Sequence, residues 1–307
     1  MNLNDKPWEA AVDQIPQSIY APKGMVGPEE RRSYYWLAKN VLSGLGCIVD
    51  AGAFVGSSTY CFAAGAAAGG RRDFNGEKLI HAFDYFKVID EYVGKAISRD
   101  FRSIGEGESY LDIFEAQTKD YADLIQSYPG DFLSHKWIGL PIEILFIDVA
   151  KTQKLNSHAV AEFFPHLIPE HSVVIHQDYY HCWHPYIHIS MEFFADEFEL
   201  LDEHIPHQSC LWRLNKPIPK EKIARIVNYD LSASERLALL DRLHEKSSPI
   251  LRPMITVVKT WQLYLDGAYA DAEELLKKMR SEYQLEDVQA LWAIQALKVE
   301  QHMKAID

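Results

Sequence analysis

The first two-thirds of the chain carries four short, largely apolar runs, and segments with the helical spacing of apolar residues separate them. A run without polar alternation is typical of a strand buried on both faces of a parallel sheet, because helices then cover both sides. The pattern therefore predicts an α/β fold with a doubly wound parallel sheet. The runs lie at residues 47–49, 78–83, 142–147 and 172–176.

Proline residues mark the start of two predicted helices. Pro28 and Pro185 suit the first helical position, where a backbone N–H has no intrahelical partner and its loss costs little. The segment 127–132 stays ambiguous, since Pro129 does not suit a strand interior; it is either a third strand or a surface turn. Helical patterns cover residues 28–42, 57–68, 90–125, 149–164 and 185–195.

Composition narrows the classes of partner. The 307 residues are 48% hydrophobic and 12% aromatic, which is enough for a sizeable core. With 31 basic against 44 acidic residues and no long basic stretch, a nucleic-acid partner is not expected. The four cysteines form no C-x-x-C pair, which favours reduced thiols. Because no signal-peptide pattern or membrane-length apolar run is present, we expect a cytoplasmic protein without a membrane partner.

The first apolar run leads into a loop with two glycines, D-A-G-A-F-V-G-S-S over residues 50–58. Gly52 and Gly56 have no Cβ and tolerate positive φ, so a ligand could lie against bare backbone. The helix N-terminus that follows offers free N–H groups to a carboxylate or phosphate. Neither the dinucleotide fingerprint G-x-G-x-x-G nor the phosphate loop G-x-x-x-x-G-K-[ST] is present. The alternative is ordinary turn chemistry.

Acidic residues follow the predicted strands. Asp50, Asp84, Asp148 and Asp178 all fall where a strand ends. In parallel sheets ligands bind beyond the carboxyl ends of the strands, so these side chains would share one edge. Asp84, at the tip of the second strand, suits a carboxylate that accepts hydrogen bonds from both hydroxyls of a ribose. The pattern indicates a nucleoside cofactor.

The succession D-A-G-A-F-V-G-S-S, A-F-D, L-F-I-D and V-V-I-H-Q-D-Y over residues 25–215 resembles the class I S-adenosylmethionine (SAM) dependent methyltransferases. Within that class it is most similar to the macrocin-type sugar O-methyltransferases and their bacterial relatives. The resemblance implies a Rossmann-like sheet of seven strands, closed by antiparallel strands at 199–201 and 209–214. It also implies the cofactor-binding residues Asp50, Ala51, Gly52, Ala53, Gly56, Ser57, Ser58, Asp84, Tyr85, Gly130, Asp131, Phe132 and Asp148.

In the macrocin-type enzymes, an Asp after the fourth strand and an Asp-Asp pair after the fifth hold Mg²⁺ beside the acceptor hydroxyls. The corresponding positions here are Asp148, Gln177 and Asp178. A carboxamide is a weaker Mg²⁺ ligand than a carboxylate, and Lys151 adds a competing positive charge. These departures put a metal requirement in doubt. Gln177 and Asp178 could orient acceptor hydroxyls without a metal.

Methyl transfer to a hydroxyl needs alignment, exclusion of water and removal of a proton. Asp148, His176 and His181 are the candidate bases, and Lys151 would orient the acceptor or bind an acidic group on it. The alternative is that both histidines only hydrogen-bond loop carbonyls. Five of the thirteen histidines lie within 171–188, which raises a zinc site, but no cysteine or carboxylate completes a familiar ligand spacing.

The chain divides into three parts on pattern alone. Residues 1–28, rich in Pro and Gly, are expected to form an irregular arm, and residues 29–218 the SAM-binding domain. Residues 219–307 have helical periodicity throughout and would cover the acceptor side or make a dimer contact. Within them, residues 263–276 resemble one tetratricopeptide helix-turn-helix unit, although a single unit is a weak signal.

The leading hypothesis is a SAM-dependent methyltransferase that O-methylates a small polar acceptor, such as a sugar or natural-product hydroxyl, as a homo-oligomer. The second is a SAM-binding but non-catalytic partner protein that uses the helical region for assembly, a reading motivated by the altered metal positions. The third is a nicotinamide-dependent oxidoreductase, which holds only if the glycine loop has another ligand. Turnover separates the first from the second, and cofactor preference separates both from the third.

Overall fold

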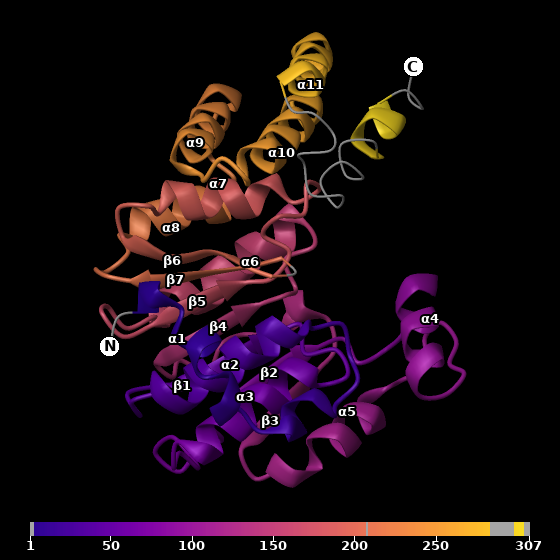
Figure 1. The fold of residues 1–307 in the computed structure, drawn as a ribbon, viewed down its shortest axis with the longest axis vertical. Helices are drawn as coiled ribbons and strands as arrows, with labels where there is room; N and C mark the ends of the chain where they lie inside the picture. The colour runs from indigo at the N-terminus through magenta and orange to yellow at the C-terminus, as the bar shows by residue number, and fades with distance from the viewer. Residues whose placement is uncertain (1–2, 207, 283–297, 304–307) are drawn as a thin grey trace.

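A seven-stranded sheet forms the centre of the computed structural model, which describes residues 3–206, 208–282 and 298–303 (Figure 1). The strand order is β3-β2-β1-β4-β5-β7-β6, and only β7 runs against the others. The predicted mostly parallel, Rossmann-like α/β fold is thereby confirmed. The strands are β1 (Cys47–Ala51), β2 (Ile80–Asp84), β3 (Ile125–Pro129), β4 (Ile142–Ile147), β5 (Val173–His176), β6 (Phe198–Ile205) and β7 (Ser209–Leu214).

The strand order reverses between β1 and β4. From β1 the chain adds β2 and β3 on one side, and it then returns to add β4 and β5 on the other. At such a switch point the connections leave in opposite directions, so a crevice opens at the carboxyl ends of the two central strands. Both strands are buried along their whole length, as their largely apolar sequences predict.

The helices follow the predicted pattern with one correction, and the ambiguous segment after them is resolved. The helix predicted over 90–125 is wrong, because α4 and α5 are separated by a loop that contains Gly105 and Gly107, the latter at φ 80°. The ambiguous third strand exists, but it spans β3 and ends at Pro129; β3 pairs only with β2 and is an edge strand, where proline is tolerated. The helices up to β6 are α1 (Pro7–Ala10), α2 (Pro28–Asn40), α3 (Ser57–Ala68), α4 (Glu91–Asp100), α5 (Leu111–Thr118), α6 (Gln153–Phe163) and α7 (Pro185–Phe193).

Helix α3 is buried on almost every side, which its alanine-rich sequence allows. It packs against α2, and the two backbones approach most closely at Gly65. A Cβ at that position would lie 2.2 Å from the carbonyl oxygen of Tyr35, so only glycine permits this contact. The small side chains of α3 therefore fix the helix that follows the glycine loop close to the sheet.

The segment before α2, which its Pro and Gly content predicted to be an irregular arm, packs against the rest of the chain through short helical turns. It contains α1 and short 3-10 helices at Leu3–Asp5, Val12–Gln14 and Gln17–Tyr20. Trp8 is buried against Trp36, and the guanidinium of Arg31 donates hydrogen bonds to backbone carbonyls of this segment. Aromatic burial and the Arg31 bonds give the segment a fixed course in spite of its composition.

Four further helices follow β7: α8 (Lys220–Val227), α9 (Ala233–Lys246), α10 (Arg252–Leu265) and α11 (Tyr269–Glu282). Helix α9 contacts α7, and α9 to α11 lie at the end of the molecule opposite β1 to β3 (Figure 1). Leu240 and Met254 belong to the same apolar cluster as the sheet. Helices α10 and α11 form the expected helix-turn-helix around Gly267, at φ 78°. One apolar core includes residues on both sides of position 218. The division of the chain into two domains at that position therefore stays a prediction.

No helix in the described part of the chain is both long and apolar enough to span a bilayer.

Candidate active site at the carboxyl edge of the sheet

Four carboxylates lie at the carboxyl ends of β1, β2, β4 and β5, as the sequence predicted. Asp50 and Asp84 fall within β1 and β2, Asp148 directly follows β4, and Asp178 lies two residues after β5. The Asp148 N–H donates to the carbonyl of Ala51, 2.7 Å away, which joins the ends of the two central strands. The four side chains thus surround the switch point of the sheet.

Asp50 connects β1 to the start of α3. Its Oδ2 accepts hydrogen bonds from the hydroxyls of Ser58, at 2.9 Å, and Thr59, at 2.6 Å, and the side chain is fully buried. Its Oδ1 has no partner among the described residues. Burial raises the pKa of Asp50 to about 6, although the two hydroxyls act in the opposite direction. Asp50 therefore fixes the geometry of the loop from below rather than presenting its carboxylate to solvent.

Both glycines of the loop are required by the fold itself. Gly52 has φ 109°, and a Cβ there would lie 2.8 Å from the carbonyl carbon of Asp148. Gly56 has φ 96°, and its Cβ would lie 2.9 Å from Thr118 and 3.0 Å from Phe114. The loop's neighbours Ala51 and Ala53 are buried. Positive φ and close packing thus explain the glycine pair without reference to a ligand.

The N-terminus of α3 is covered by the chain. Ser57 and Ser58 are buried, and a Cβ at Gly24 would lie 2.3 Å from the Ser57 hydroxyl oxygen. The Gln117 amide donates to the carbonyls of Lys23 and Val55 and accepts from the Lys23 N–H. The segment around Gly24 therefore lies over the N–H groups that the sequence assigned to a ligand. No sequence signal indicated Gln117.

Asp84 already has three hydrogen-bond donors. Its Oδ2 accepts from the N–H of Phe54 at 2.8 Å, and its Oδ1 accepts from the N–H of Phe86 at 2.8 Å and the hydroxyl of Tyr110 at 2.6 Å. The backbone N–H of Tyr85 also interacts with this carboxylate, so its roughly four acceptor positions are already engaged. Burial raises the pKa of Asp84, although these donors oppose the rise. Its neighbour Tyr85 is 46% exposed.

The Gly-Asp-Phe segment after β3 is only partly placed as predicted. The Gly130 N–H donates to the carbonyl of Asp84, 3.0 Å away, which keeps the segment beside the tip of β2. Asp131 is exposed and accepts from the Leu133 N–H at 3.0 Å, capping a short 3-10 helix. Phe132, also among the implied cofactor-binding residues, is buried and packs with the core.

Lys151 joins the carboxylates after β4 and β5. Its Nζ lies 2.5 Å from Asp148 Oδ1 and also forms an ion pair with Asp178 Oδ2. Burial raises the pKa of Asp148 to about 7, although Lys151 opposes the rise. For Asp178, contact with Lys151 outweighs burial and leaves the pKa below its usual value. The two carboxylates in turn hold the pKa of Lys151 above its ordinary range, although partial loss of water around the ammonium acts in the opposite direction.

Gln177 faces a different set of partners. Its Oε1 hydrogen-bonds with the Ser209 hydroxyl, which also lies 2.6 Å from Glu30 Oε1 and 2.9 Å from the Tyr34 hydroxyl. Glu30 is fully buried and also accepts the Gly27 N–H at the start of α2. This network joins β5, β7 and α2. The sequence indicated Gln177, but Glu30 and Ser209 gave no signal because they lie 179 residues apart.

The structure separates the two candidate histidine bases. His176 is fully buried with its ring against Trp212, neither ring nitrogen has a partner among the described residues, and burial lowers its pKa to about 3. An enclosed imidazole cannot reach an acceptor, which argues against His176 as a base. His181 is half-buried and stacks on His184; burial lowers its pKa, whereas Asp178 raises it. In the described part of the chain, the Nδ1 atom of His181 has no hydrogen-bond partner either.

The residues at the positions of the implied Mg²⁺ site do not fit the ion. Lys151 contacts both carboxylates, and the Gln177 oxygen is engaged by Ser209. Across residues 3–206, 208–282 and 298–303, no three His, Cys, Asp or Glu side chains converge as metal ligands would. The same holds there for the zinc site that the histidine-rich segment suggested.

Comparison with known proteins gives distant structural likenesses. No family model and no curated protein sequence matches the chain. The O-methyltransferase NovP superposes with a TM-score of 0.49 and 17% identity over 63% of this chain and 82% of that one. An O-methyltransferase from Bacillus cereus in complex with SAH has a TM-score of 0.33 and 15% identity, over 76% of this chain and 78% of that one. A methyltransferase from Geobacter sulfurreducens has a TM-score of 0.37 and 17% identity, over 68% of this chain and 89% of that one. These likenesses are too distant to carry a function.

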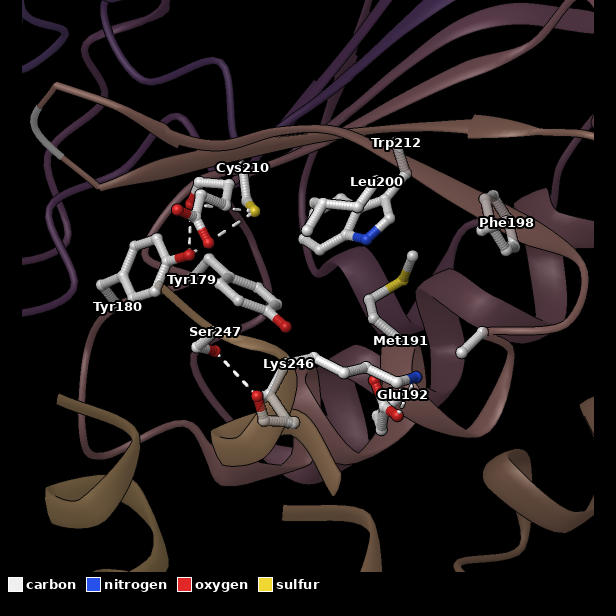
Figure 2. Close-up of a pocket in the computed structure, with 13 residues that line it drawn as sticks. Tyr179, Tyr180, Met191, Glu192, Phe198, Leu200, Cys210, Trp212, Lys246 and Ser247 are labelled. Carbon is white, nitrogen blue, oxygen red and sulfur yellow. Dashed lines mark hydrogen bonds and ion pairs between the residues drawn. The ribbon is translucent and has the colours of Figure 1, made fainter. Parts of the chain in front are cut away.

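A cavity of about 190 Å³ lies between β6, β7, α7 and α9 (Figure 2). Its walls are mostly aromatic and aliphatic, and the ring of Trp212 and the hydroxyl of Tyr179 point into it. None of the sequence-predicted site residues lines it. The lining residues are Tyr179, Tyr180, Met191, Glu192, Ala195, Phe198, Leu200, Glu203, Cys210, Trp212, Leu243, Lys246 and Ser247.

Proposed function

We propose that the chain is a SAM-dependent methyltransferase that methylates a hydroxyl oxygen of a small polar acceptor, such as a sugar or another natural product. One observation carries the proposal. The glycine loop after β1 lies at the switch point of the sheet, and Asp84 lies at the tip of the neighbouring strand β2. A nucleoside cofactor needs this combination, a glycine turn at the end of one strand beside a carboxylate that can accept ribose hydroxyls.

The residues present fit the cofactor on the side of β1 and β2. Asp84 would accept a ribose hydroxyl in exchange for one of its present donors, and Tyr85, Gly130 and Asp131 lie next to it along the edge. The loop from Ala51 to Ser58 would hold the amino-acid end. The chain around Gly24 covers the start of α3, so its displacement would have to accompany binding there. When bound, SAM would supply the methyl group from its sulfonium; the C–S bond breaks and its electron pair stays on sulfur, which leaves as a neutral thioether.

Asp148 is our proposed base. It directly follows β4 at the switch point, and 25% of its side chain is exposed, whereas His176 is enclosed. Its carboxylate would take the proton of the acceptor hydroxyl as the oxygen lone pair forms the new C–O bond. His181 and Asp178 lie on the same loop after β5 and would orient the acceptor. The chain's own groups thereby account for both alignment and proton removal.

Calorimetric titration of the purified protein with SAM, its demethylated product and NAD tests the cofactor. We expect micromolar binding of the two sulfur nucleosides and none of NAD. Release of the demethylated product in the presence of hydroxylated sugars and phenols then tests the transfer. Binding of NAD alone would overturn the proposal in favour of a nicotinamide enzyme.

A second candidate is a SAM-binding protein without catalysis. The observation that favours it is Lys151, whose ammonium contacts the carboxylates that macrocin-type enzymes use to bind Mg²⁺ beside the acceptor. Such a protein would bind SAM with the same affinity but release no product with any acceptor. The helical region after β7 would then serve assembly, and we expect a homo-oligomer in either case. Light scattering during size-exclusion chromatography measures the oligomeric state.

A further inference from the structure

We propose that Lys151 takes the place of a divalent cation: its ammonium neutralises Asp148 and Asp178, so that the site excludes Mg²⁺ and works without it. The statement about cation binding stands on the ion pairs alone. Its consequence for catalysis rests on the proposed function.

The first argument is the position of the ammonium. The Nζ of Lys151 lies 2.5 Å from Asp148 Oδ1 and contacts Asp178 Oδ2, so one cation bridges the ends of β4 and β5. A Mg²⁺ ion bound by the same two oxygens would need about 2.0–2.1 Å to each and therefore almost the same point in space. Two cations cannot share that point, since like charges a few ångströms apart repel by several kcal/mol, of order 4 kcal/mol near a protein surface.

The second argument is how firmly the backbone holds Lys151. It lies in the turn between β4 and α6, where its N–H donates to the carbonyl of Val149 at 2.7 Å. Directly after it, the Thr152 hydroxyl caps α6 by accepting the Leu155 N–H at 3.2 Å. The spacing of three residues from Asp148 is thus set by a strand end and a capped helix start. The ammonium does not depend on a flexible surface loop for its position.

The third argument concerns Gln177, the remaining position of the implied metal site. Gln177 uses its side-chain oxygen for the Ser209 hydroxyl, in a network with Glu30 and Tyr34. A metal at Asp148 and Asp178 would therefore lack its third protein ligand. This observation is independent of the lysine, because the network lies on the β7 side of the loop. Both the occupied position and the missing ligand point to a site without metal.

The arrangement leaves Lys151 with a further capacity. An ammonium has three N–H donors, and the two carboxylates use two of them. The side chain is 47% exposed, so the third N–H can reach an acceptor oxygen. Lys151 would then hold the acceptor beside Asp148, which is the role that Mg²⁺ plays in the macrocin-type enzymes.

The test is a titration with Mn²⁺ as a probe for Mg²⁺, followed by electron paramagnetic resonance of the free ion and by thermal unfolding with and without MgCl₂. Four full-length proteins are compared: the wild type, Lys151→Ala, Lys151→Met and Lys154→Ala. Lys154 is an exposed lysine in the first turn of α6 with no ion pair in the described residues, and it controls for the loss of one positive charge. Lys151→Met removes the ammonium but keeps most of the aliphatic stem, so it tests whether the charge rather than the packing of the side chain excludes the ion.

We expect no stoichiometric Mn²⁺ binding by the wild type or Lys154→Ala. Lys151→Met, which loses the ammonium, should bind Mn²⁺ more tightly than the wild type. Lys151→Ala opens the position between two carboxylates, and we expect it to bind one Mn²⁺ at least about tenfold more tightly than the wild type. Its unfolding temperature should rise with MgCl₂, whereas that of the wild type should not. Added EDTA should leave SAM binding and any methyl transfer by the wild type unchanged.

Stoichiometric micromolar Mn²⁺ binding by the wild type would overturn the proposal without any variant, so it stays testable even if Lys151→Ala does not fold. A folded Lys151→Ala protein that gains no Mn²⁺ binding would overturn it as well. The proposed function fails separately: a protein that binds neither SAM nor Mn²⁺, but gains Mn²⁺ binding on Lys151→Ala, would keep the cation assignment and lose the methyltransferase.

Discussion

The two halves of the carboxyl edge satisfy their acidic residues in different ways. On the side of β1 and β2, Asp50 and Asp84 accept hydrogen bonds only from neutral donors, which are hydroxyls and backbone N–H groups. On the side of β4 and β5, Asp148 and Asp178 share the ammonium of Lys151. The first half is held by groups that fix a backbone turn, whereas the second holds a charged side chain that a substrate can reach.

This difference suggests a division of labour. In the β1–β2 half, the neutral donors fix the conformation of the backbone turn, which is the part that we propose binds the cofactor. The ion-paired half keeps opposite charges side by side, where proton transfer and acceptor binding need them. Substitutions in the two halves should therefore have different effects: cofactor affinity or stability for the first, turnover for the second.

The largest effect is expected from Asp148→Asn. The amide keeps the shape of the side chain but cannot take a proton, and general bases contribute about 10²–10⁴-fold to rates. We expect product release to fall by at least about a hundredfold, with SAM affinity changed little. Asp178→Asn is the matched control, because it also removes one carboxylate from Lys151; we expect a loss of about tenfold. Equal losses in both variants would contradict Asp148 as the base.

Asp84→Ala should have the next largest effect. It removes the proposed ribose acceptor and also releases Phe54, Phe86 and Tyr110 from their common partner. We expect SAM affinity to fall by about a hundredfold in calorimetry, since hydrogen bonds to a charged group contribute about 1.5–3 kcal/mol each. Tyr110→Phe removes one of the same hydrogen bonds without removing the carboxylate. If Asp84→Ala binds SAM as tightly as the wild type, Asp84 does not hold the ribose.

Asp50→Asn should change the pH dependence of stability. The folded pKa of Asp50, about 6, lies above its unfolded value, so its contribution is fully present below about pH 4 and is lost as the pH rises through 6. We expect the loss of this contribution between about pH 4 and pH 6 to lower the free energy of unfolding by about 2–3 kcal/mol. The asparagine variant should lack this part of the slope in urea unfolding at several pH values. An unchanged slope would show that Asp50 is not a titrating group there.

The smallest effect is expected from His176→Leu. The imidazole is enclosed, with no hydrogen-bond partner in the described residues, and a buried polar group without a partner costs about 1–3 kcal/mol. We expect turnover within about twofold of the wild type and stability equal or slightly higher. A large loss of turnover with an intact fold would return His176 to the candidate bases.

Much of the fold followed from local pattern. The apolar runs gave β1, β2, β4 and β5 to within about two residues, and Pro28, Ser57 and Pro185 gave three helix starts. Prediction failed where long-range contacts decide. The helix expected over 90–125 was interrupted, and the Pro- and Gly-rich segment before α2 became ordered because Trp8 and Arg31 found buried partners.

The candidate site divides in the same way. The positions of Asp50, Asp84, Asp148 and Asp178 at one edge follow from the sequence alone, because in a parallel sheet all strands present their carboxyl ends on the same side. What each carboxylate contacts was not predictable. Tyr110 donates to Asp84, Gln117 to the carbonyl of Val55, and Ser209 to Glu30; each partner comes from a distant part of the chain, so only the folded structure brings the two atoms together.

The sequence by itself determined the order of strands and helices, the glycine loop and the row of acidic residues, since these follow from periodicity and from local backbone requirements. The tertiary structure decided that His176 is enclosed, that Gly24 covers the start of α3, and that Lys151 bridges two carboxylates. Burial and ion pairing depend on which surfaces meet in three dimensions. That information appears in the chain only after it has folded.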